Sequence, residues 1–375
     1  MERIYLDHAA TTPLHPKARE AMAPWLEREF GNPSSLYEEG RKARLAIDEA
    51  REKISGLIGC EFGELFFTSS GTEAANLAVL GCALAAREGR KKRILMGSAE
   101  HHAVLHTAPL LQSMGYAVDQ IAVDRFARIS IEDLRARLND DVLLVCAMHA
   151  NNELGTLQPV REVAELAKKS DALFFCDAVQ TFCSLDWNVD DLGADLVALS
   201  AHKTYGPKGV GALYVRAGTP LKPISVGGGQ EREMRAGTEN VSGIVGFAEA
   251  SNAIWRENPC SAAAREQFLS EFERREAVRS VPPAIDCLPG HAHVRFPGLS
   301  AESMLIVLDR LGVSASSGAA CSSGSLEPSH VLLAAGYSEI EAKEGLRFTF
   351  GRHAKIEQAR EAAERVIEAA RIVRG

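Results

Sequence analysis

The first half of the chain alternates helix-like and strand-like patterns of hydrophobic residues. Apolar residues at helical spacing predict a helix that ends near Gly59, and a strongly apolar helix follows over residues 72–86. Short runs that are apolar on both faces predict strands at residues 65–68, 93–96, 142–147, 172–176, 196–199 and 211–215. Strands of this kind, separated by helices, are typical of a mostly parallel sheet covered on both faces. We therefore expect a doubly wound α/β core.

The pattern changes after Gly237. A mostly helical stretch over residues 241–279 shows no strand signal, and we expect Pro259 to divide it into two helices. Strands and helices then follow at residues 292–296, 301–311, 346–350 and 356–374. This pattern predicts a smaller α+β domain. The predicted boundaries are residues 15–254 for the large domain, and residues 1–14 with 255–375 for the small one.

Composition and charge exclude several classes of protein. Hydrophobic residues make up 46% and charged residues 25% of the 375, which is typical of a globular protein. The net charge of −8 argues against a surface for direct nucleic-acid binding. The longest strongly apolar run, residues 77–86, is shorter than the roughly 20 residues that span a membrane. Three charged residues among the first 13 argue against a signal peptide, so we expect a cytoplasmic protein without a membrane anchor.

One of the eight cysteines lies in an unusual setting. The cysteines are scattered without a CxxC pair, so we expect reduced thiols, most of them buried. Cys321 instead lies in residues 314–325, which are almost all Ser, Ala and Gly. Such a segment is expected to form a flexible loop that exposes a reactive thiol. The alternative is a plain linker that happens to contain a cysteine.

The densest chemical signal is the segment Ser200–Gly209, which lies between two predicted strands. A lysine at the end of a buried strand is costly unless it is used, because an ammonium group loses its hydration there. Lys203, flanked by Ser200, His202 and a glycine turn, suits a Schiff base with an aldehyde cofactor. The alternative is an ordinary turn with Lys203 exposed to solvent.

Asp177 follows the predicted strand 172–176, and its carboxylate is expected at the end of the sheet where α/β proteins bind ligands. There it can pair with a pyridinium nitrogen, while Gln180 can donate to a phenolic oxygen on the same ring. A helix N-cap is the alternative for Asp177. The segment Thr68–Glu73 joins a strand to a helix and suits a phosphate, although it also fits an ordinary capping box.

His101 follows another predicted strand and can lie flat over an aromatic cofactor and shuttle protons. The competing interpretation is a metal site that uses His102 and His106 at helical spacing. It is disfavoured because the segment has neither a HExxH pattern nor a cysteine pair. We therefore expect no metal site.

These residues resemble the cysteine desulfurases of the NifS/IscS type, which are pyridoxal-phosphate enzymes of the class V aminotransferase superfamily with fold type I. The similarity runs almost end to end, through the segments 5–13, 30–33, 149–155, 200–209, 227–232, 235–238 and 316–330. The last segment, with Ser-Leu-Glu-Pro-Ser-His after Cys321, is the most specific. The resemblance implies a seven-stranded, mostly parallel sheet in the large domain and a catalytic Cys loop on the small one.

The resemblance also assigns roles to residues. Lys203 would form the Schiff base and move the substrate's α-proton, with His101 stacked on the ring and Asp177 at the pyridinium. The remaining cofactor contacts would come from Gly71, Thr72, Asn152, Gln180, Ser200, His202 and, across a homodimer with shared active sites, Thr238. Asn32 and Arg352 would bind the substrate.

The implied reaction takes sulfur from L-cysteine, leaving L-alanine and a persulfide on Cys321. The sulfur would pass to an acceptor protein, either an iron–sulfur scaffold or a tRNA-thiolation enzyme, and transient cluster ligation by Cys321 stays open. Two alternatives remain: another β-lyase or aminotransferase on the same scaffold, such as a selenocysteine lyase, and a non-catalytic scaffold that retains the fold. Alanine plus persulfide would indicate desulfuration, a keto acid would indicate transamination, and a protein that binds no coenzyme would indicate the scaffold.

Overall fold

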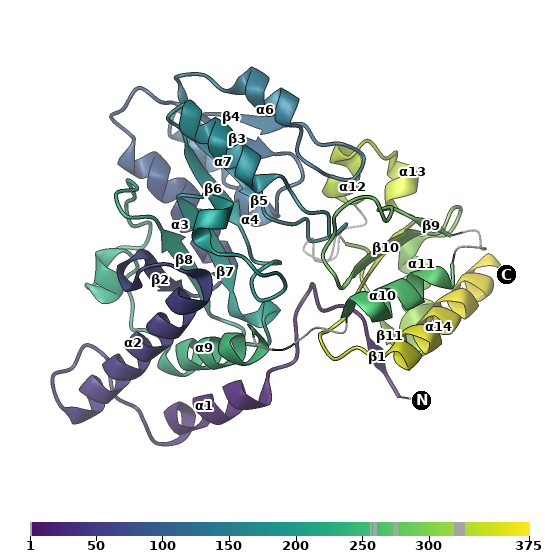
Figure 1. Cartoon of the computed structure of the whole chain (residues 1–375), viewed down its shortest axis with the longest axis horizontal. Coiled ribbons are helices and arrows are strands. Elements are labelled where there is room, and N and C mark those ends of the chain that lie inside the picture. The colour runs from purple at the N-terminus through teal and green to yellow at the C-terminus, as the bar shows by residue number, and fades with distance from the viewer. Residues whose placement is uncertain (1, 256, 258–260, 273–276, 319–326) are drawn as a thin grey trace.

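The computed structural model describes residues 2–255, 257, 261–272, 277–318 and 327–375. A seven-stranded sheet forms the larger lobe, with the strand order β2-β8-β7-β6-β5-β3-β4 (Figure 1). Its strands are β2 (Leu65–Thr68), β3 (Arg93–Gly97), β4 (Ala117–Ile121), β5 (Val142–Met148), β6 (Leu173–Asp177), β7 (Leu196–Ser200) and β8 (Gly211–Val215). All neighbours pair in parallel except β8, which is antiparallel to both β2 and β7. The predicted mostly parallel sheet is confirmed.

Successive residues of a strand point to opposite faces of a sheet, and apolar side chains lie on both faces of this one. Helices therefore cover both faces. In β5, Val145 and Ala147 join one core and Leu144 and Cys146 join the other. The first core packs against α2 (Glu38–Ile58), α6 (Ile131–Arg137), α7 (Val160–Lys169), α8 (Val189–Leu192) and α9 (Val241–Trp255). The second packs against α3 (Gly71–Ala85), α4 (His102–Leu105) and α5 (Ala108–Ser113). Helix α1 (Pro16–Glu27) lies against α9.

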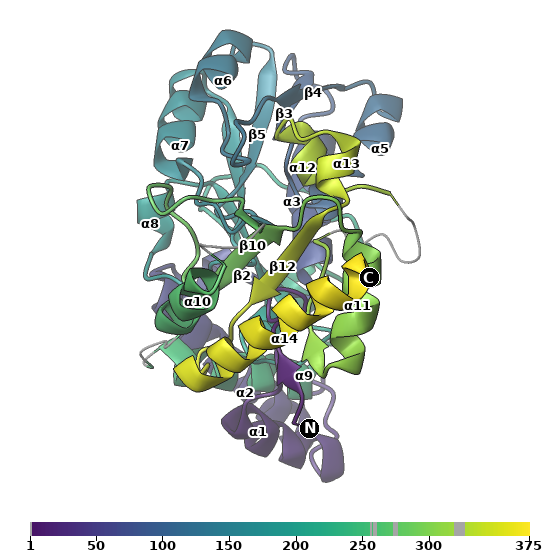
Figure 2. The ribbon, with the colours of Figure 1, turned by 90° about the vertical axis from the view of Figure 1, so that its right-hand side faces the viewer.

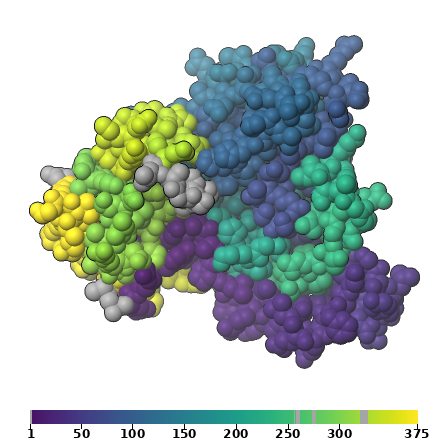
Figure 3. Space-filling view, turned by 180° about the vertical axis from the view of Figure 1, so that it is seen from behind, coloured from purple at the N-terminus to yellow at the C-terminus, as the bar shows by residue number. Residues whose placement is uncertain are grey.

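The smaller lobe has a core of its own. It contains an antiparallel sheet, β12-β10-β9, from Gly345–Thr349, His291–Arg295 and Val278–Arg279. Its helices are α10 (Ser261–Ser270), α11 (Ala301–Arg310), α12 (His330–Ala334), α13 (Glu339–Ala342) and α14 (Ile356–Arg374). The first strand of the chain, β1 (Ile4–Tyr5), pairs in parallel with β11 (Val313–Ser314), beside α14 (Figure 2). The N-terminal segment therefore returns to this lobe as expected, and Figure 3 shows it running between the two lobes.

Four strands were not predicted from the sequence: β1, β4, β9 and β11. β4 was not predicted, because it lies at the edge of the sheet and only its last residue, Ile121, is buried. β9 shows that the stretch 241–279 does not end as helix. β1, β9 and β11 have two residues each and β4 is interrupted by polar residues, so none of the four gives an apolar run. Within the described ranges, no helix has both the length and the hydropathy needed to cross a membrane.

Candidate active site

A cavity lies beside the carboxyl ends of β5, β6 and β7, where ligands bind in α/β sheets. Met148, Asp177 and Ser200, which end these strands, all line it. Nine residues predicted to bind the cofactor share this cavity: Gly71, Thr72, His101, Asn152, Asp177, Gln180, Ser200, His202 and Lys203. The fold thus brings together side chains that are more than 130 positions apart in the sequence.

Lys203 projects into the cavity from the short 3-10 turn Ala201–Lys203, which follows β7 directly. Its Nζ donates hydrogen bonds to the carbonyl oxygens of Ala9, at 2.5 Å, and Ala10, at 2.8 Å. The amine is therefore held at the cavity wall by two neutral acceptors from the N-terminal segment.

Asp177 is the last residue of β6, and its Oδ1 accepts a hydrogen bond from the Val179 backbone N–H at 2.9 Å. Burial raises the pKa of Asp177 to about 6, although the Val179 hydrogen bond and the Lys203 charge act against the rise. No helix begins at residue 178, so the N-cap alternative for Asp177 is wrong. A carboxylate in this environment gains from a cationic partner, because its charge is otherwise poorly solvated.

His101 is neutral at physiological pH. Burial, followed by the charges of Lys203, His102, His330 and His106, lowers the pKa of His101 to about 4. Its Nδ1 accepts a hydrogen bond from the Ala103 backbone N–H at 3.1 Å, so in the neutral ring the proton is on Nε2. The neutral imidazole therefore has one N–H donor, at Nε2, and an uncharged ring face.

The N-terminus of α3 meets the same cavity through Ser70, Gly71 and Thr72. A side chain at position 71 would crowd its neighbours, because a Cβ there would lie 2.8 Å from Val179 Cγ2 and 3.2 Å from Ser200 Cβ. Because position 71 has no side chain, the N-terminal backbone N–H groups of this 15-residue helix are accessible from the cavity. The helix dipole favours an anion at this end. The segment therefore suits an anion inside the cavity.

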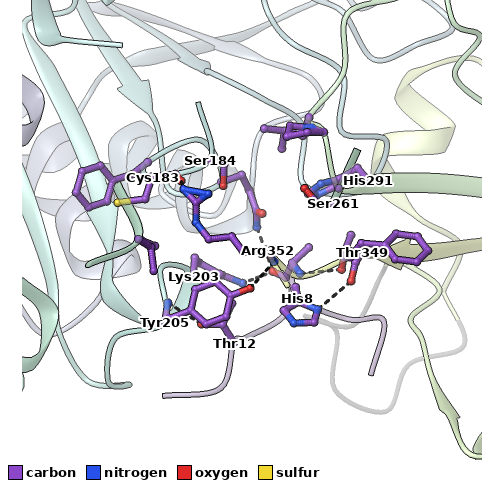
Figure 4. A pocket seen from close by; sticks show the side chains of 18 residues that line it. His8, Thr12, Cys183, Ser184, Lys203, Tyr205, Ser261, His291, Thr349 and Arg352 are labelled. Carbon is purple, nitrogen blue, oxygen red and sulfur yellow. Dashed lines mark hydrogen bonds between the residues drawn. The ribbon is translucent and has the colours of Figure 1, made fainter. Parts of the chain in front are cut away.

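Arg352 lines an adjoining cavity, which shares Lys203, Gln180 and Ala9 with the first (Figure 4). Its guanidinium donates to the carbonyl oxygens of Cys183 at 2.7 Å and Glu257 at 3.2 Å. Its backbone N–H donates to the Tyr205 hydroxyl at 2.8 Å. Arg352 is thus held at the wall of a cavity that Lys203 also lines.

Several cavity residues were not predicted from sequence. His8 and His291 line the Arg352 cavity, and the buried Nε2 of His291 has no hydrogen-bond partner among the described residues. Arg347, on β12 of the smaller lobe, reaches the first cavity and donates to the Asn152 carbonyl at 3.0 Å and to Asp7 Oδ1 at 2.8 Å. His8 lies in a segment that carried the family resemblance, and this was the signal that could have found it.

Two predicted site residues line neither cavity, and a third lies outside the described residues. Asn32 and Thr238 are exposed and line neither cavity of their own chain, so their roles stay predictions. Cys321 lies outside the described residues. The structure describes Gly318, three positions before it, and this glycine lines the cavity that contains Lys203.

The six cysteines that the structure describes are poor nucleophiles. Four of them, Cys82, Cys146, Cys176 and Cys183, are buried. Burial raises the pKa of Cys82 to about 12, and it raises the pKa of the half-buried Cys60 and Cys287 to about 11. A thiol with such a pKa is almost entirely protonated at neutral pH and is unreactive.

The alternative metal site at His102 and His106 gains no support. The two rings are stacked with their centroids 4.4 Å apart and an interplanar angle of 10°. Over residues 2–255, 257, 261–272, 277–318 and 327–375, no group of three or more His, Cys, Asp or Glu side chains is arranged to hold a metal ion.

Comparison with known proteins agrees with this geometry. The family model "Aminotransferase class-V" matches residues 4–361. The "Cysteine desulfurase IscS" of Dictyoglomus turgidum is 44% identical over 378 residues, covering 99% of this chain and 96% of that protein. The "Cysteine desulfurase IscS" of Methanosarcina thermophila is 41% identical, covering 93% of this chain and 87% of that protein.

Solved structures are similar over the same extent. One named "NIFS-LIKE PROTEIN" superposes with a TM-score of 0.92 at 33% identity, covering 99% of this chain and 100% of the other. Another, "SspA in complex with cysteine", has a TM-score of 0.84 at 34% identity, covering 94% and 99%. The chain therefore belongs to the class V aminotransferase family. Within that family it groups with the cysteine desulfurases, to which it is similar over nearly its full length.

Proposed function

We propose that this protein is a pyridoxal 5'-phosphate-dependent cysteine desulfurase, which converts L-cysteine to L-alanine and collects the sulfur as a persulfide on Cys321. The observation that carries the proposal is the shared cavity of Lys203, Asp177 and Asn152, with Gly318 in its wall. The named relatives are cysteine desulfurases, and one similar structure is a complex with cysteine.

The donor set of the cavity fits this coenzyme. Lys203 would bind its aldehyde carbon, and Asp177, whose carboxylate is buried and has a raised pKa, would bind the ring N–H. The buried Oδ1 of Asn152 has no hydrogen-bond partner among the described residues, and it suits a hydroxyl on the ring. Gln180 would bind the same ring hydroxyl. The phosphate would be held by the N-terminal turn of α3 with Gly71, Thr72, Ser200 and His202.

When bound, pyridoxal phosphate supplies an electron sink that weakens the Cα–H and C–S bonds of an amino acid attached to it. Residues of the chain would bind the substrate and transfer its α-proton. Arg352 would bind the substrate carboxylate with two parallel hydrogen bonds. Lys203, once its amine is free, would take the α-proton, and the uncharged His101 would lie against the ring without repelling a cation.

Cys321 would attack the substrate sulfur. L-cysteine and the Cys321 thiol give L-alanine and a Cys321 persulfide, so the atoms balance and no external oxidant is needed. Three residues span at most about 11 Å, so a sulfur at position 321 is covalently tethered near the cavity wall at Gly318. The raised pKa of the described thiols Cys60, Cys82 and Cys287 argues against these as substitutes.

The protein is proposed to act as a homodimer with shared active sites. Phe30 and Leu36, which flank Asn32 in the sequence, are 86% and 89% exposed, so this region offers apolar surface that a partner subunit could cover. An interface there would bury them and would let the exposed Asn32 and Thr238 serve the partner's pocket. In the cytoplasm, the persulfide would pass to an acceptor protein of iron–sulfur assembly or tRNA thiolation.

Product analysis tests the proposed reaction. Wild-type protein given cysteine and a thiol reductant should release equal amounts of alanine and sulfide. Cys321→Ser should keep the coenzyme absorbance but release almost no sulfide, whereas the control Cys60→Ser should match the wild type. A keto acid as the main product, or undiminished sulfide from Cys321→Ser, would contradict the proposal.

A further inference from the structure

A buried carboxylate lies between the two ends of the segment that carries Cys321. Glu153 follows β5, two positions after Asn151, and is 1% exposed. Its Oε2 accepts a hydrogen bond from the Ser329 hydroxyl at 2.5 Å. The same oxygen would lie 2.4 Å from a Cβ at position 318, so the Gly318 backbone contacts it directly. One oxygen atom thus contacts a residue on each side of residues 319–328.

Glu153 is itself held rigidly next to the cofactor cavity. Asn151 Oδ1 accepts the backbone N–H groups of Glu153 and Leu154, both at 2.9 Å. Asn151 is fully buried, and its Nδ2 donates to the Ala99 carbonyl at 3.2 Å. The next residue, Asn152, lines the cavity. The Glu153 carboxylate therefore belongs to a hydrogen-bonded turn, residues 151–154, that also lines the cavity through Asn152.

The leading end of the segment is attached to this turn by a second route. Ser316 and Arg347 exchange backbone hydrogen bonds, at 3.2 Å from the Ser316 N–H and 2.6 Å from the Arg347 N–H. The Arg347 guanidinium then donates to the Asn152 carbonyl at 3.0 Å. Gly318, two positions further on, has φ of +87°, a conformation that strains any residue with a Cβ. The backbone is thus directed onto Glu153 at a point where only glycine fits.

The trailing end is fixed by Ser329. Its hydroxyl accepts the Leu332 N–H at 3.1 Å, as the N-cap of α12, and donates its proton to Glu153. Next to it, the His330 Nε2 bonds the Glu100 carbonyl at 2.9 Å. The proposed reaction uses neither Glu153 nor Ser329, and a buried carboxylate is costly unless its contacts repay the lost hydration.

We propose that Glu153 is a positioning residue that holds both ends of the Cys321 segment against the cofactor cavity, and so controls how fast Cys321 accepts sulfur. The inference rests on the proposed function for the identity of the step that it affects. The positioning itself rests on the contacts of Gly318, Ser329 and Glu153.

The first test measures a single turnover. Wild type, Glu153→Ala, Glu153→Gln and Ser329→Ala are loaded with coenzyme and mixed with cysteine, and persulfide on Cys321 is followed by mass spectrometry. We expect Glu153→Ala and Ser329→Ala to slow persulfide formation at least tenfold with unchanged coenzyme absorbance. Glu153→Gln should lose less, because its amide oxygen still accepts the Ser329 proton. Ser338→Ala removes a similar serine cap, from α13, and should change the rate less than twofold.

The second test needs no turnover. Amide hydrogen exchange is measured on peptides that cover residues 314–332. Glu153→Ala should raise exchange at both ends of the segment, whereas Ser338→Ala should not. Unchanged exchange, an unchanged persulfide rate, or a rate that falls only in proportion to lost coenzyme would each overturn the inference. If the wild type gains no sulfur on Cys321, the proposed function is contradicted. The difference in hydrogen exchange between wild type and Glu153→Ala would still decide whether Glu153 positions the segment.

Discussion

Glu231→Gln should destabilise the larger lobe, because it breaks a buried ion pair. Glu231 and Arg51 have side chains that are 1% and 2% exposed, and they form two parallel hydrogen bonds of 2.7 and 2.8 Å. Glu231 Oε2 also accepts the Phe67 N–H of β2 at 2.7 Å. Removing one charge from such a pair costs about 3–5 kcal/mol, since the other charge stays buried and uncompensated.

The same pair holds a strained segment. Residues 231, 232 and 233 have φ values of 45°, 54° and 67°, and each conformation of this kind costs about 1–3 kcal/mol for a residue other than glycine. The segment leads to Thr238, which is proposed to serve the partner's pocket. We therefore expect Glu231→Gln to weaken coenzyme binding as well as stability.

Thermal unfolding of the coenzyme-loaded protein measures the effect on stability. At roughly 2 °C per kcal/mol for a chain of this size, the loss of about 3–5 kcal/mol should lower the Tm by about 6–10 °C. The double variant Arg51→Met/Glu231→Gln should recover part of the loss, because no unpaired guanidinium remains. Lys53 lies on the same helix as Arg51, α2, and forms a partly exposed ion pair with Glu249 of α9. The control Lys53→Gln removes this pair and should change the Tm by about 2 °C or less. A Glu231→Gln variant within that range would refute the reasoning.

Two further predictions concern the lysine and the buried histidines. Lys203→Ala should abolish the Schiff-base absorbance of added pyridoxal phosphate. The control Lys208→Ala, at an exposed turn position, should keep this absorbance. An unchanged spectrum in Lys203→Ala would contradict the role assigned to Lys203. Burial lowers the pKa of His293 to about 3, against 6.5 when unfolded, so the unfolded chain binds more protons below pH 6.5 and stability falls as the pH is lowered. His293→Asn should reduce that loss by roughly 1 kcal/mol per pH unit between pH 6 and 4, as measured by denaturant unfolding, and an unchanged pH dependence would contradict the prediction.

The sequence predicted the part of the site that local patterns encode. Asp177 and Lys203 each follow a buried apolar strand, and parallel strands place their carboxyl ends at one edge of a sheet. Two residues 26 positions apart were therefore expected in one cavity, and the structure brings them there. The N-terminus of α3 was found in the same way, from a strand followed by a helix with Gly71 at its start.

Contacts between distant segments were not predictable from such patterns. Arg347 lies in a strand of the smaller lobe, and nothing in its local sequence indicates that it reaches Asn152. The acceptors of Lys203 are backbone carbonyls of Ala9 and Ala10, whose side chains carry no chemical signal. The contact of Glu153 with Ser329 joins residues 176 positions apart. Long-range packing fixes each of these, and hydrophobic periodicity does not report it.

The central claim, that sulfur leaves cysteine and arrives on one particular side chain, is tested most directly by peptide mass spectrometry. The coenzyme-loaded protein is incubated with L-cysteine without reductant and then digested. The account predicts one added sulfur atom on the peptide that contains Cys321 and none on the peptide that contains Cys60. Sulfur on another thiol, or a protein that gains none while alanine accumulates, would contradict it.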